Sequence, residues 1–169
     1  WKANMSGADL SSTSLKGANL SGTNLTNAML LDSNLSGAKL WRANMKFSHL
    51  RRANLTRADL RGADLTDASL REAELSGADL SGADLTDTSL RDADLSGADM
   101  TNAFMNGADL WKTNLSEADL SGTFLRGANL NDADLTNAML LDSDLRGADL
   151  TNANLRGAKL NRAVLRSAF

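Results

Sequence analysis

The sequence predicts an all-β solenoid, in which the chain coils into a tube around an apolar core. The 169 residues divide from position 1 into 33 five-residue repeats and four further residues, without one insertion. In every repeat the third residue is small and the fifth is Leu or Met, all 13 glycines occupy the second position, and no proline occurs. Self-similarity at a fixed period is typical of stacked repeat arrays.

The third and fifth residues of each repeat are expected to fill the core. The fifth is Leu in 29 repeats and Met in four, and the third is Ala, Ser or Thr. Five residues advance an α-helix by roughly 500°, so its leucines would form no stripe. On a strand the third and fifth residues face the same way. The next small residue is three positions further on, which breaks the alternation, so the chain must turn once per repeat.

The second residue of each repeat is expected to take the positive φ that a type II turn needs. Glycine suits this position. Asparagine suits it as well, at Asn27, Asn102, Asn137 and Asn152. Another turn type is expected at Arg42, Phe47, Arg52 and Arg57. Successive coils can then pair at a spacing of ~4.8 Å, and periodicity alone leaves the number of sides per coil open.

Composition excludes several kinds of site and partner. With no Cys and one His, the chain has no disulfide, thiolate metal site, His-pair zinc site or cysteine nucleophile. His49 points outward and a filled rod offers no pocket, so we expect no enzyme activity, metal or cofactor. A net charge of -3 favours no direct nucleic-acid binding. No apolar run approaches the ~20 residues of a membrane span and no signal peptide is visible, which predicts a cytoplasmic protein without membrane contact.

Many repeats share one pattern, A(D/N)LXX when read from the small residue. Examples are SGADL at 76–80 and 81–85, RGADL at 61–65 and TNANL at 151–155. In this pattern the chain resembles the pentapeptide-repeat family, and its style resembles bacterial and especially cyanobacterial members. The match covers 1–169 as a single domain with no linker and no terminal helical cap visible.

The resemblance implies a right-handed, four-sided (quadrilateral) β-helix with twenty residues per coil. Such a rod would have about eight and a half coils and a length of roughly 40 Å at ~4.8 Å per coil. Residue i+20 would then stack on residue i. The recurrence of aromatic residues at 104 and 124 is compatible with that stacking.

Charge is distributed unevenly along the predicted rod. Residues 1–58 carry a net charge of +6, residues 59–120 carry -10 and residues 121–169 carry +1. Stacking at i+20 places four aspartates of the middle segment in one column, the acidic ladder: Asp59, Asp79, Asp99 and Asp119. Like charges about 5 Å apart repel by roughly 1 kcal/mol in a water-like medium, so the pKa of some of these carboxyl groups is expected to be raised.

Three interpretations of the acidic ladder stay open. The aspartates fill the fourth position of the family pattern, they imitate the backbone of a nucleic acid, or they hold calcium between coils. Single oxygens from successive coils rarely supply the six ligands of calcium. Some pentapeptide-repeat proteins protect or inhibit type II topoisomerases, so the resemblance makes DNA gyrase a candidate partner. This chain departs from those members in its basic ends and in having no C-terminal helix for dimerisation.

Basic residues are expected to balance charge instead of binding a duplex. Six of them ring one coil and do not form a one-sided patch: Arg42, Lys46, Arg51, Arg52, Arg57 and Arg61. One column mixes the two signs: Asp32, Arg52, Glu72, Asp92, Lys112 and Asp132. Ion pairs between coils are expected along this column.

Apolar residues at outward positions indicate a second kind of surface. All seven aromatic residues are outward and none occupies a core position. The candidate interaction patch lies near one corner: Phe104, Phe124, Met139 and Leu141. A second group lies near another corner: Met29, Leu31 and Phe47. Such clusters contact partners or shield neighbouring coils, and we favour partner contact.

The ends of an uncapped solenoid expose strand edges and core leucines. We therefore expect an end-to-end homodimer or a chain that continues beyond these residues. Trp1 and Phe169 are the aromatic residues that could cover the two ends.

The sequence thus predicts a non-catalytic rigid solenoid that serves as a protein-interaction or scaffold module through its lateral faces. Its protein partner is not identified by the residues. The alternative is a DNA-mimicking acidic rod that binds DNA gyrase. Binding through charge should weaken steeply with salt, whereas binding through apolar residues should not.

Overall fold

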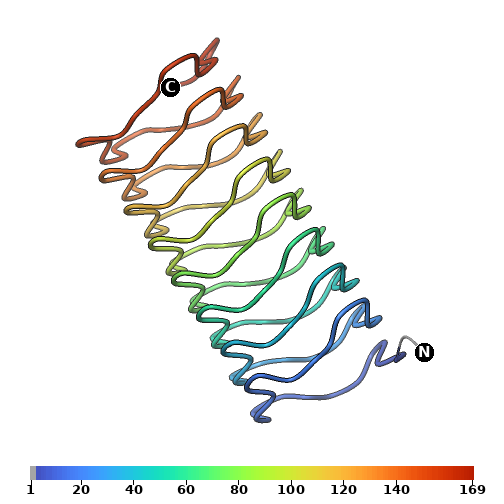
Figure 1. Ribbon diagram of the computed structural model, residues 1–169. Coiled ribbons are helices and arrows are strands. Elements are labelled where there is room, and N and C mark those ends of the chain that lie inside the picture. Colours follow the sequence, from blue (N-terminus) through green and yellow to red (C-terminus); the bar gives the residue numbers. More distant parts are fainter. Residues whose placement is uncertain (1–2) are drawn as a thin grey trace.

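The computed structural model describes residues 3–169, which form a rod of stacked coils with the two ends of the chain at opposite ends of the rod (Figure 1). Each repeat consists of a turn followed by one bridge residue at its fourth position. That residue pairs in parallel with its equivalent twenty residues later, as Asp59 does with Asp79. A coil therefore contains twenty residues and four turns.

The sides of the coil are short, because the chain turns once per repeat as the sequence predicts. Residues 3–169 contain no helix and no strand longer than a single bridge residue, because the chain turns again after three residues. Accordingly, a helix long and apolar enough to cross a membrane does not occur in this described part of the chain.

Backbone hydrogen bonds join each repeat to the coils on both sides. In the repeat 81–85, the N–H groups of Gly82 and Leu85 donate to carbonyls of the following coil at 2.9 and 2.6 Å. Asp84 N–H donates to the preceding coil at 2.9 Å, and Ala83 N–H closes the turn by donating to the carbonyl three residues earlier, also at 2.9 Å. Four of the five N–H groups are thereby satisfied by backbone.

The fifth N–H belongs to the first residue of the repeat, and a side chain accepts it. Asp79 Oδ1 accepts from Ser81 N–H at 3.1 Å, and Asn114 Oδ1 accepts from Ser116 N–H at 3.1 Å. Every Asn and Asp at a fourth position of the described chain makes this contact with the N–H two residues later. The short side-chain oxygen closes an Asx turn, which explains why the fourth position prefers these two residues.

All second positions of the described chain have a positive φ, from 51° at Arg42 to 73° at Gly157. Only this residue of each turn has a positive φ, as the third of the four residues of a type II turn does. The expectation of another turn type is therefore wrong at four corners: φ is 51° at Arg42, 57° at Phe47, 56° at Arg52 and 54° at Arg57. Hydrogen bonds between coils hold these corners in the common geometry and override the local preference.

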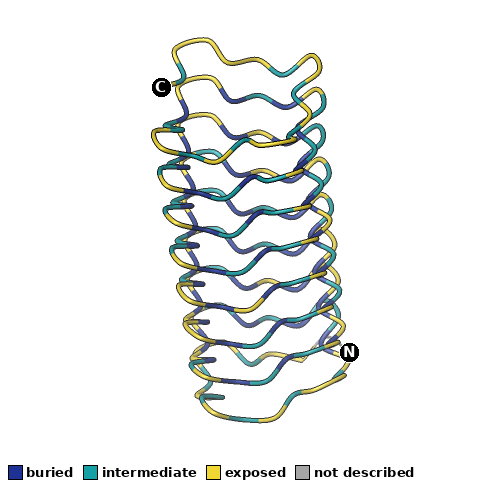
Figure 2. Ribbon diagram, turned by 90° about the vertical axis from the view of Figure 1, so that its left-hand side faces the viewer, coloured by how far each residue is buried: buried dark blue, intermediate teal, exposed yellow. Residues whose placement is uncertain are grey.

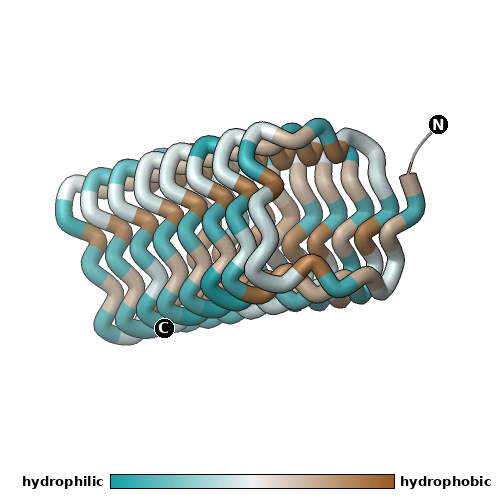
Figure 3. The backbone as a smooth tube through the Cα atoms, turned by 90° about the horizontal axis from the view of Figure 1, so that it is seen from below, coloured by the Kyte–Doolittle hydropathy of each residue, from teal (hydrophilic) through white to brown (hydrophobic). Residues whose placement is uncertain are grey.

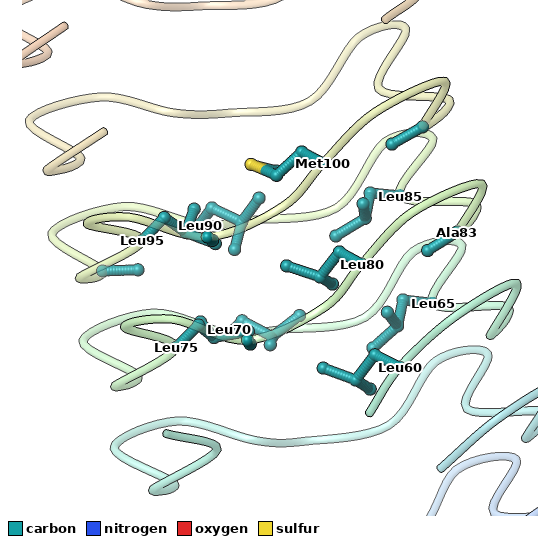
Figure 4. Packing of buried hydrophobic residues seen from close by; sticks show 14 of the residues in the cluster. Leu60, Leu65, Leu70, Leu75, Leu80, Ala83, Leu85, Leu90, Leu95 and Met100 are labelled. Carbon is teal, nitrogen blue, oxygen red and sulfur yellow. The ribbon is translucent and has the colours of Figure 1, made fainter. Parts of the chain in front are cut away.

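The inside of the rod is filled by the fifth and third residues of the repeats. From residue 20 to residue 148 all of them are buried, so that the inner side of each coil is apolar (Figures 2 and 3). Residues twenty apart stack in columns, as Leu60, Leu80 and Met100 do (Figure 4). Most polar third residues have a bonded hydroxyl: Ser48 Oγ donates to the carbonyl three residues earlier at 2.6 Å. Backbone carbonyls thereby accept these hydroxyls inside the core.

The last coil is less well covered. Leu155 and Leu160 are half-buried, and Leu165 is 42% exposed. Phe169 is 80% exposed, so it does not cover the core leucines at this end as the sequence suggests. Trp1, the corresponding candidate at the other end, lies outside the described residues.

Substitutions at second positions test the turn. We expect Phe47→Asn to raise the free energy of unfolding by about 1 kcal/mol, because asparagine tolerates the left-handed region that costs other residues roughly 1–2 kcal/mol. Gly97→Val should lower it by at least a similar amount, since a β-branched side chain is worst suited to positive φ. Urea unfolding followed by circular dichroism measures both changes. Ser96→Ala, one residue earlier in the same turn, is the control, and a destabilised Phe47→Asn variant would contradict this account.

Candidate interaction surfaces

An exposed aromatic pair lies on one side of the rod. Phe104 and Phe124 occupy fourth positions of successive coils, and their backbones pair directly. Their rings stack with centroids 5.1 Å apart and an angle of 6° between the ring planes. The two side chains are 44% and 38% exposed. Stacking orders both rings while leaving much of their apolar surface in contact with water.

Met139 and Leu141 lie beside this pair, on the coil that follows Phe124. Met139 pairs with Asp119, at the end of the side that precedes the corner. The carbonyl of Leu141 accepts a hydrogen bond from Gly122 N–H at 2.7 Å, at the corner itself. Both side chains are half-buried. The structure thus brings all four residues of the predicted patch around one corner, which we call the aromatic corner.

Turn chemistry does not explain a phenylalanine at position 124. Asn or Asp at this position would bind the N–H of Arg126. Instead, Arg126 N–H donates to Asn106 Oδ1 from the preceding coil at 3.1 Å. The fold compensates for the missing Asx contact, so the exposed ring replaces a residue that would serve the turn directly.

Charged residues border the aromatic pair at both ends of its column. Asp84 pairs with Phe104 at one end of the column, and Asp144 pairs with Phe124 at the other end. Asp144 also binds two arginines, Arg126 Nε at 2.5 Å and a terminal guanidinium nitrogen of Arg146 at 2.6 Å. The aromatic corner is therefore an apolar centre with a polar border.

The acidic ladder lies on the side next to the aromatic corner, and its four members follow one another through direct backbone pairing. Each carboxylate accepts the N–H two residues later, at distances from 2.9 to 3.3 Å. Asparagine makes the same contact elsewhere in the rod, for example at Asn114. The turn therefore requires an oxygen at these positions but does not require a negative charge.

One arginine neutralises part of the ladder. Arg61 binds Asp59 at 2.7 Å and approaches Asp79 at 3.6 Å. The hydrogen bond from Arg61 holds the pKa of Asp59 below its ordinary value, so the expectation of a raised pKa is wrong at this carboxyl group. Within residues 3–169, Asp99 and Asp119 make no ion pair. The unneutralised charge lies in the half of the ladder nearer the aromatic corner.

Most bases of the predicted ring serve ion pairs. The pairs, at 2.6 to 3.0 Å, are Lys46 with Asp64, Arg51 with Glu72, Arg52 with Asp32, and Arg61 with Asp59. Arg42 instead lies over the ring of Trp41, 4.6 Å from its centroid. In the column of mixed charge, Arg52 pairs with Asp32 as predicted. Glu72 does not pair within this column, because its carboxylate binds Arg51 in the neighbouring column.

A groove that the sequence analysis did not predict lies beside Trp111. It has a volume of about 410 Å³, and Arg91, Asn129, Gly127 and Gly147 are among its lining residues. Arg91 Cζ and Lys112 Nζ lie over the Trp111 ring, 5.7 and 4.2 Å from its centroid. Gly127 and Gly147 have no side chains, which leaves the groove open on their side. The recurrence of glycine at positions twenty residues apart is the sequence feature that could have predicted this groove.

The second apolar group is spread over a corner and one side. Met29 pairs with the exposed His49, and Met29 and Phe47 are 42% and 47% exposed. Leu31 is half-buried.

No group of three His, Cys, Asp or Glu residues in the described chain could hold a metal ion, the acidic ladder included.

Comparisons with known proteins agree with the repeat pattern. The family profile described as pentapeptide repeats matches eight overlapping copies that together extend from residue 3 to residue 166. No curated protein sequence matches the chain.

Several solved structures are similar to this rod. HetL, a pentapeptide repeat protein involved in heterocyst differentiation regulation from the cyanobacterium Nostoc sp. strain PCC 7120, is 32% identical, with 97% of this chain and 90% of that chain covered and a TM-score of 0.42. A trypsin-treated form of QnrB1, a plasmid-mediated fluoroquinolone resistance protein, is 22% identical, with coverage of 92% and 76% and a TM-score of 0.73. A second trypsin-treated form has 22% identity, coverage of 97% and 85%, and a TM-score of 0.71. At this identity the likeness to QnrB1 shows a shared fold. The chain therefore belongs to the pentapeptide-repeat family, and its fold is a right-handed β-helix solenoid.

Proposed function

We propose that this chain is a non-catalytic, right-handed, four-sided rod that binds a partner protein through the aromatic corner. The observation that carries the proposal is the exposed, stacked pair of Phe104 and Phe124, at positions where the repeat elsewhere places a polar residue that serves the turn. Hydrogen bonds to both neighbouring coils support the backbone beneath the rings. The site is thus apolar at its centre and presented on a rigid scaffold.

Physical chemistry favours such a corner as a binding site. Aromatic side chains contribute large contact areas and are enriched among the residues that dominate binding energy. Rings that are already ordered by stacking lose little further freedom on association. The carboxylate of Asp84 borders the pair on one side, and the two arginines that bind Asp144 border it on the other, which favours a partner with an apolar pocket surrounded by charged groups of both signs.

Replacing both rings by asparagine tests this proposal. Phe104→Asn/Phe124→Asn should keep the fold, because asparagine at a fourth position closes the Asx turn, and should reduce partner capture about tenfold or more, as expected when central aromatic contacts are lost. The measurement compares proteins that co-purify with each variant from the native host, by quantitative mass spectrometry. Met29→Asn, which also replaces an exposed apolar side chain by asparagine at a fourth position but on another side, is the matched control. A double variant that retains every specific partner would disprove the role of the aromatic corner.

A second candidate function, mimicry of DNA, has a specific observation in its favour. The ladder carries aspartate at four stacked positions where asparagine would serve the turn equally well. Asp99 and Asp119 in particular are not neutralised within the described chain. A DNA-binding enzyme such as DNA gyrase would recognise a regular row of negative charge. QnrB1, a plasmid-mediated fluoroquinolone resistance protein, has the same fold.

A supercoiling assay with DNA gyrase tests the mimicry. If the ladder binds the enzyme, the protein should inhibit supercoiling at low salt and lose this effect as salt rises, because the attraction is electrostatic. Changing all four ladder aspartates to asparagine should abolish inhibition without unfolding the rod. The double variant of the aromatic corner serves as the control and should inhibit normally. Inhibition that survives the loss of all four charges excludes the ladder as the cause.

Arg61→Gln tests the electrostatics of the ladder itself. Because the hydrogen bond from Arg61 is the largest cause of the lowered pKa of Asp59, the variant should return this pKa toward its ordinary value. A lowered pKa in the folded state stabilises the fold above the ordinary carboxyl pKa, and this stabilisation is lost as the pH falls through the lowered value. The variant should therefore lose less stability on acidification than the parent. Carboxyl-carbon NMR titration reports the pKa; Arg42→Gln is the control, and an unchanged Asp59 titration in the Arg61 variant would refute the assignment.

A further inference from the structure

A pocket of about 300 Å³ opens at one corner near the N-terminal end of the rod. Its lining residues come from three successive coils and are Lys16, Ser36, Gly37, Thr56 and Arg57. Stacking at i+20 explains how residues forty positions apart reach one place: the lysine and the two hydroxyl residues share one column, and the glycine and the arginine share the next.

The floor of the pocket is open because of a glycine. Gly37 has a φ of +63°, and a Cβ added there would meet nothing within 4 Å. The backbone donors at this corner are already used: Gly37 N–H donates to the carbonyl of Thr56 at 2.9 Å, and Arg57 N–H donates to the next coil at 3.1 Å. Recognition of a ligand therefore falls to the side chains.

Both cations of the pocket are free to bind an anion. Within residues 3–169, neither Lys16 nor Arg57 makes an ion pair. Acidic residues on the adjoining sides have other partners: Glu74 accepts a hydrogen bond from Asn54 at 2.8 Å, and Asp59 binds Arg61. The surrounding segment, residues 1–58, has an excess of positive charge.

Both hydroxyl groups are free as well. Ser36 Oγ and Thr56 Oγ1 make no hydrogen bond in the described chain, although other residues of their column do. Ser116 Oγ donates to its fourth-position neighbour at 2.7 Å and Thr136 Oγ1 does so at 2.5 Å. Two cations and two unengaged hydroxyl donors therefore converge on one open floor.

We propose that this corner, the basic pocket, binds a phosphate group, either as inorganic phosphate or as the phosphate of a small ester. Arginine offers a planar fork of donors to two phosphate oxygens, lysine offers a compact charge, and the hydroxyls add neutral donors. The backbones of Lys16 and Arg57 are two coils apart, roughly 10 Å, a separation that two long side chains can close around a tetrahedral ion. The proposal is independent of the aromatic corner and of the acidic ladder.

Phosphorus NMR titration with inorganic phosphate tests the pocket. Lys16→Gln and Arg57→Gln should each weaken binding about tenfold or more, the usual effect of losing a charge-assisted hydrogen bond. Arg42→Gln is the matched control. Arg42 also occupies a second position, and its Cγ lies 3.6 Å from a Cβ built on the glycine of the next coil, as that of Arg57 does. It lies over Trp41 instead of the pocket. Equal loss in the control, or no saturable binding below about 10 mM in the parent, would overturn the proposal.

A second pair of variants separates binding from folding. Gly37→Asn should abolish phosphate binding by filling the floor, and it should leave the unfolding midpoint unchanged because asparagine adopts a similar φ of 56° at Asn27. Gly97→Asn, at the same corner three coils away, should leave binding intact. Methyl phosphate distinguishes the two sources: tighter binding than inorganic phosphate assigns the pocket to an ester, and weaker binding assigns it to the free ion. Full binding by the Gly37→Asn variant would refute the site.

Discussion

The rod depends on one backbone arrangement, a turn whose second residue has a positive φ and donates its N–H to the following coil. The arrangement is the same at Gly147, where the φ is 68°, and at Arg42, where it is 51° and the residue is poorly suited to it. Hydrogen bonds from both neighbouring coils hold the geometry, so a corner tolerates almost any side chain. This tolerance leaves three outward positions per repeat available for function.

The fourth position shows how structural and functional demands separate. Where the residue is Asn or Asp, its oxygen satisfies the one N–H per repeat that the backbone leaves unpaired, and either residue is sufficient. A fourth-position residue that the turn does not require therefore points to a role outside the turn. Phe104 and Phe124 give up the contact and expose stacked rings, while the ladder keeps the contact and adds charge. Both choices occur on adjoining sides of the same coils, which concentrates the candidate surfaces in one region of the rod.

Much of this could be predicted from the sequence. The period of five, the small third residue and the apolar fifth residue were sufficient to predict the coil, its core and the outward direction of the other three positions. Stacking at i+20 then placed Phe104 on Phe124 and aligned the ladder aspartates, because these placements depend on register alone. The resemblance to the family pattern predicted the right-handed β-helix, and the family repeats match along nearly the whole chain.

Tertiary structure decided the backbone conformation at unfavourable corners and the partners of the charged side chains, because both depend on contacts between neighbouring coils. Local preference argues against a left-handed Phe47, but hydrogen bonds between coils impose that conformation. Long charged side chains reach more than one column, so the sequence could not show that Glu72 would bind Arg51 or that Arg61 would lower the pKa of Asp59. The basic pocket likewise exists only where three coils meet. The sequence by itself determined the register and the direction of each side chain, because both follow from a strict repeat; the partners of those side chains were settled by packing across coils, where several columns lie within reach.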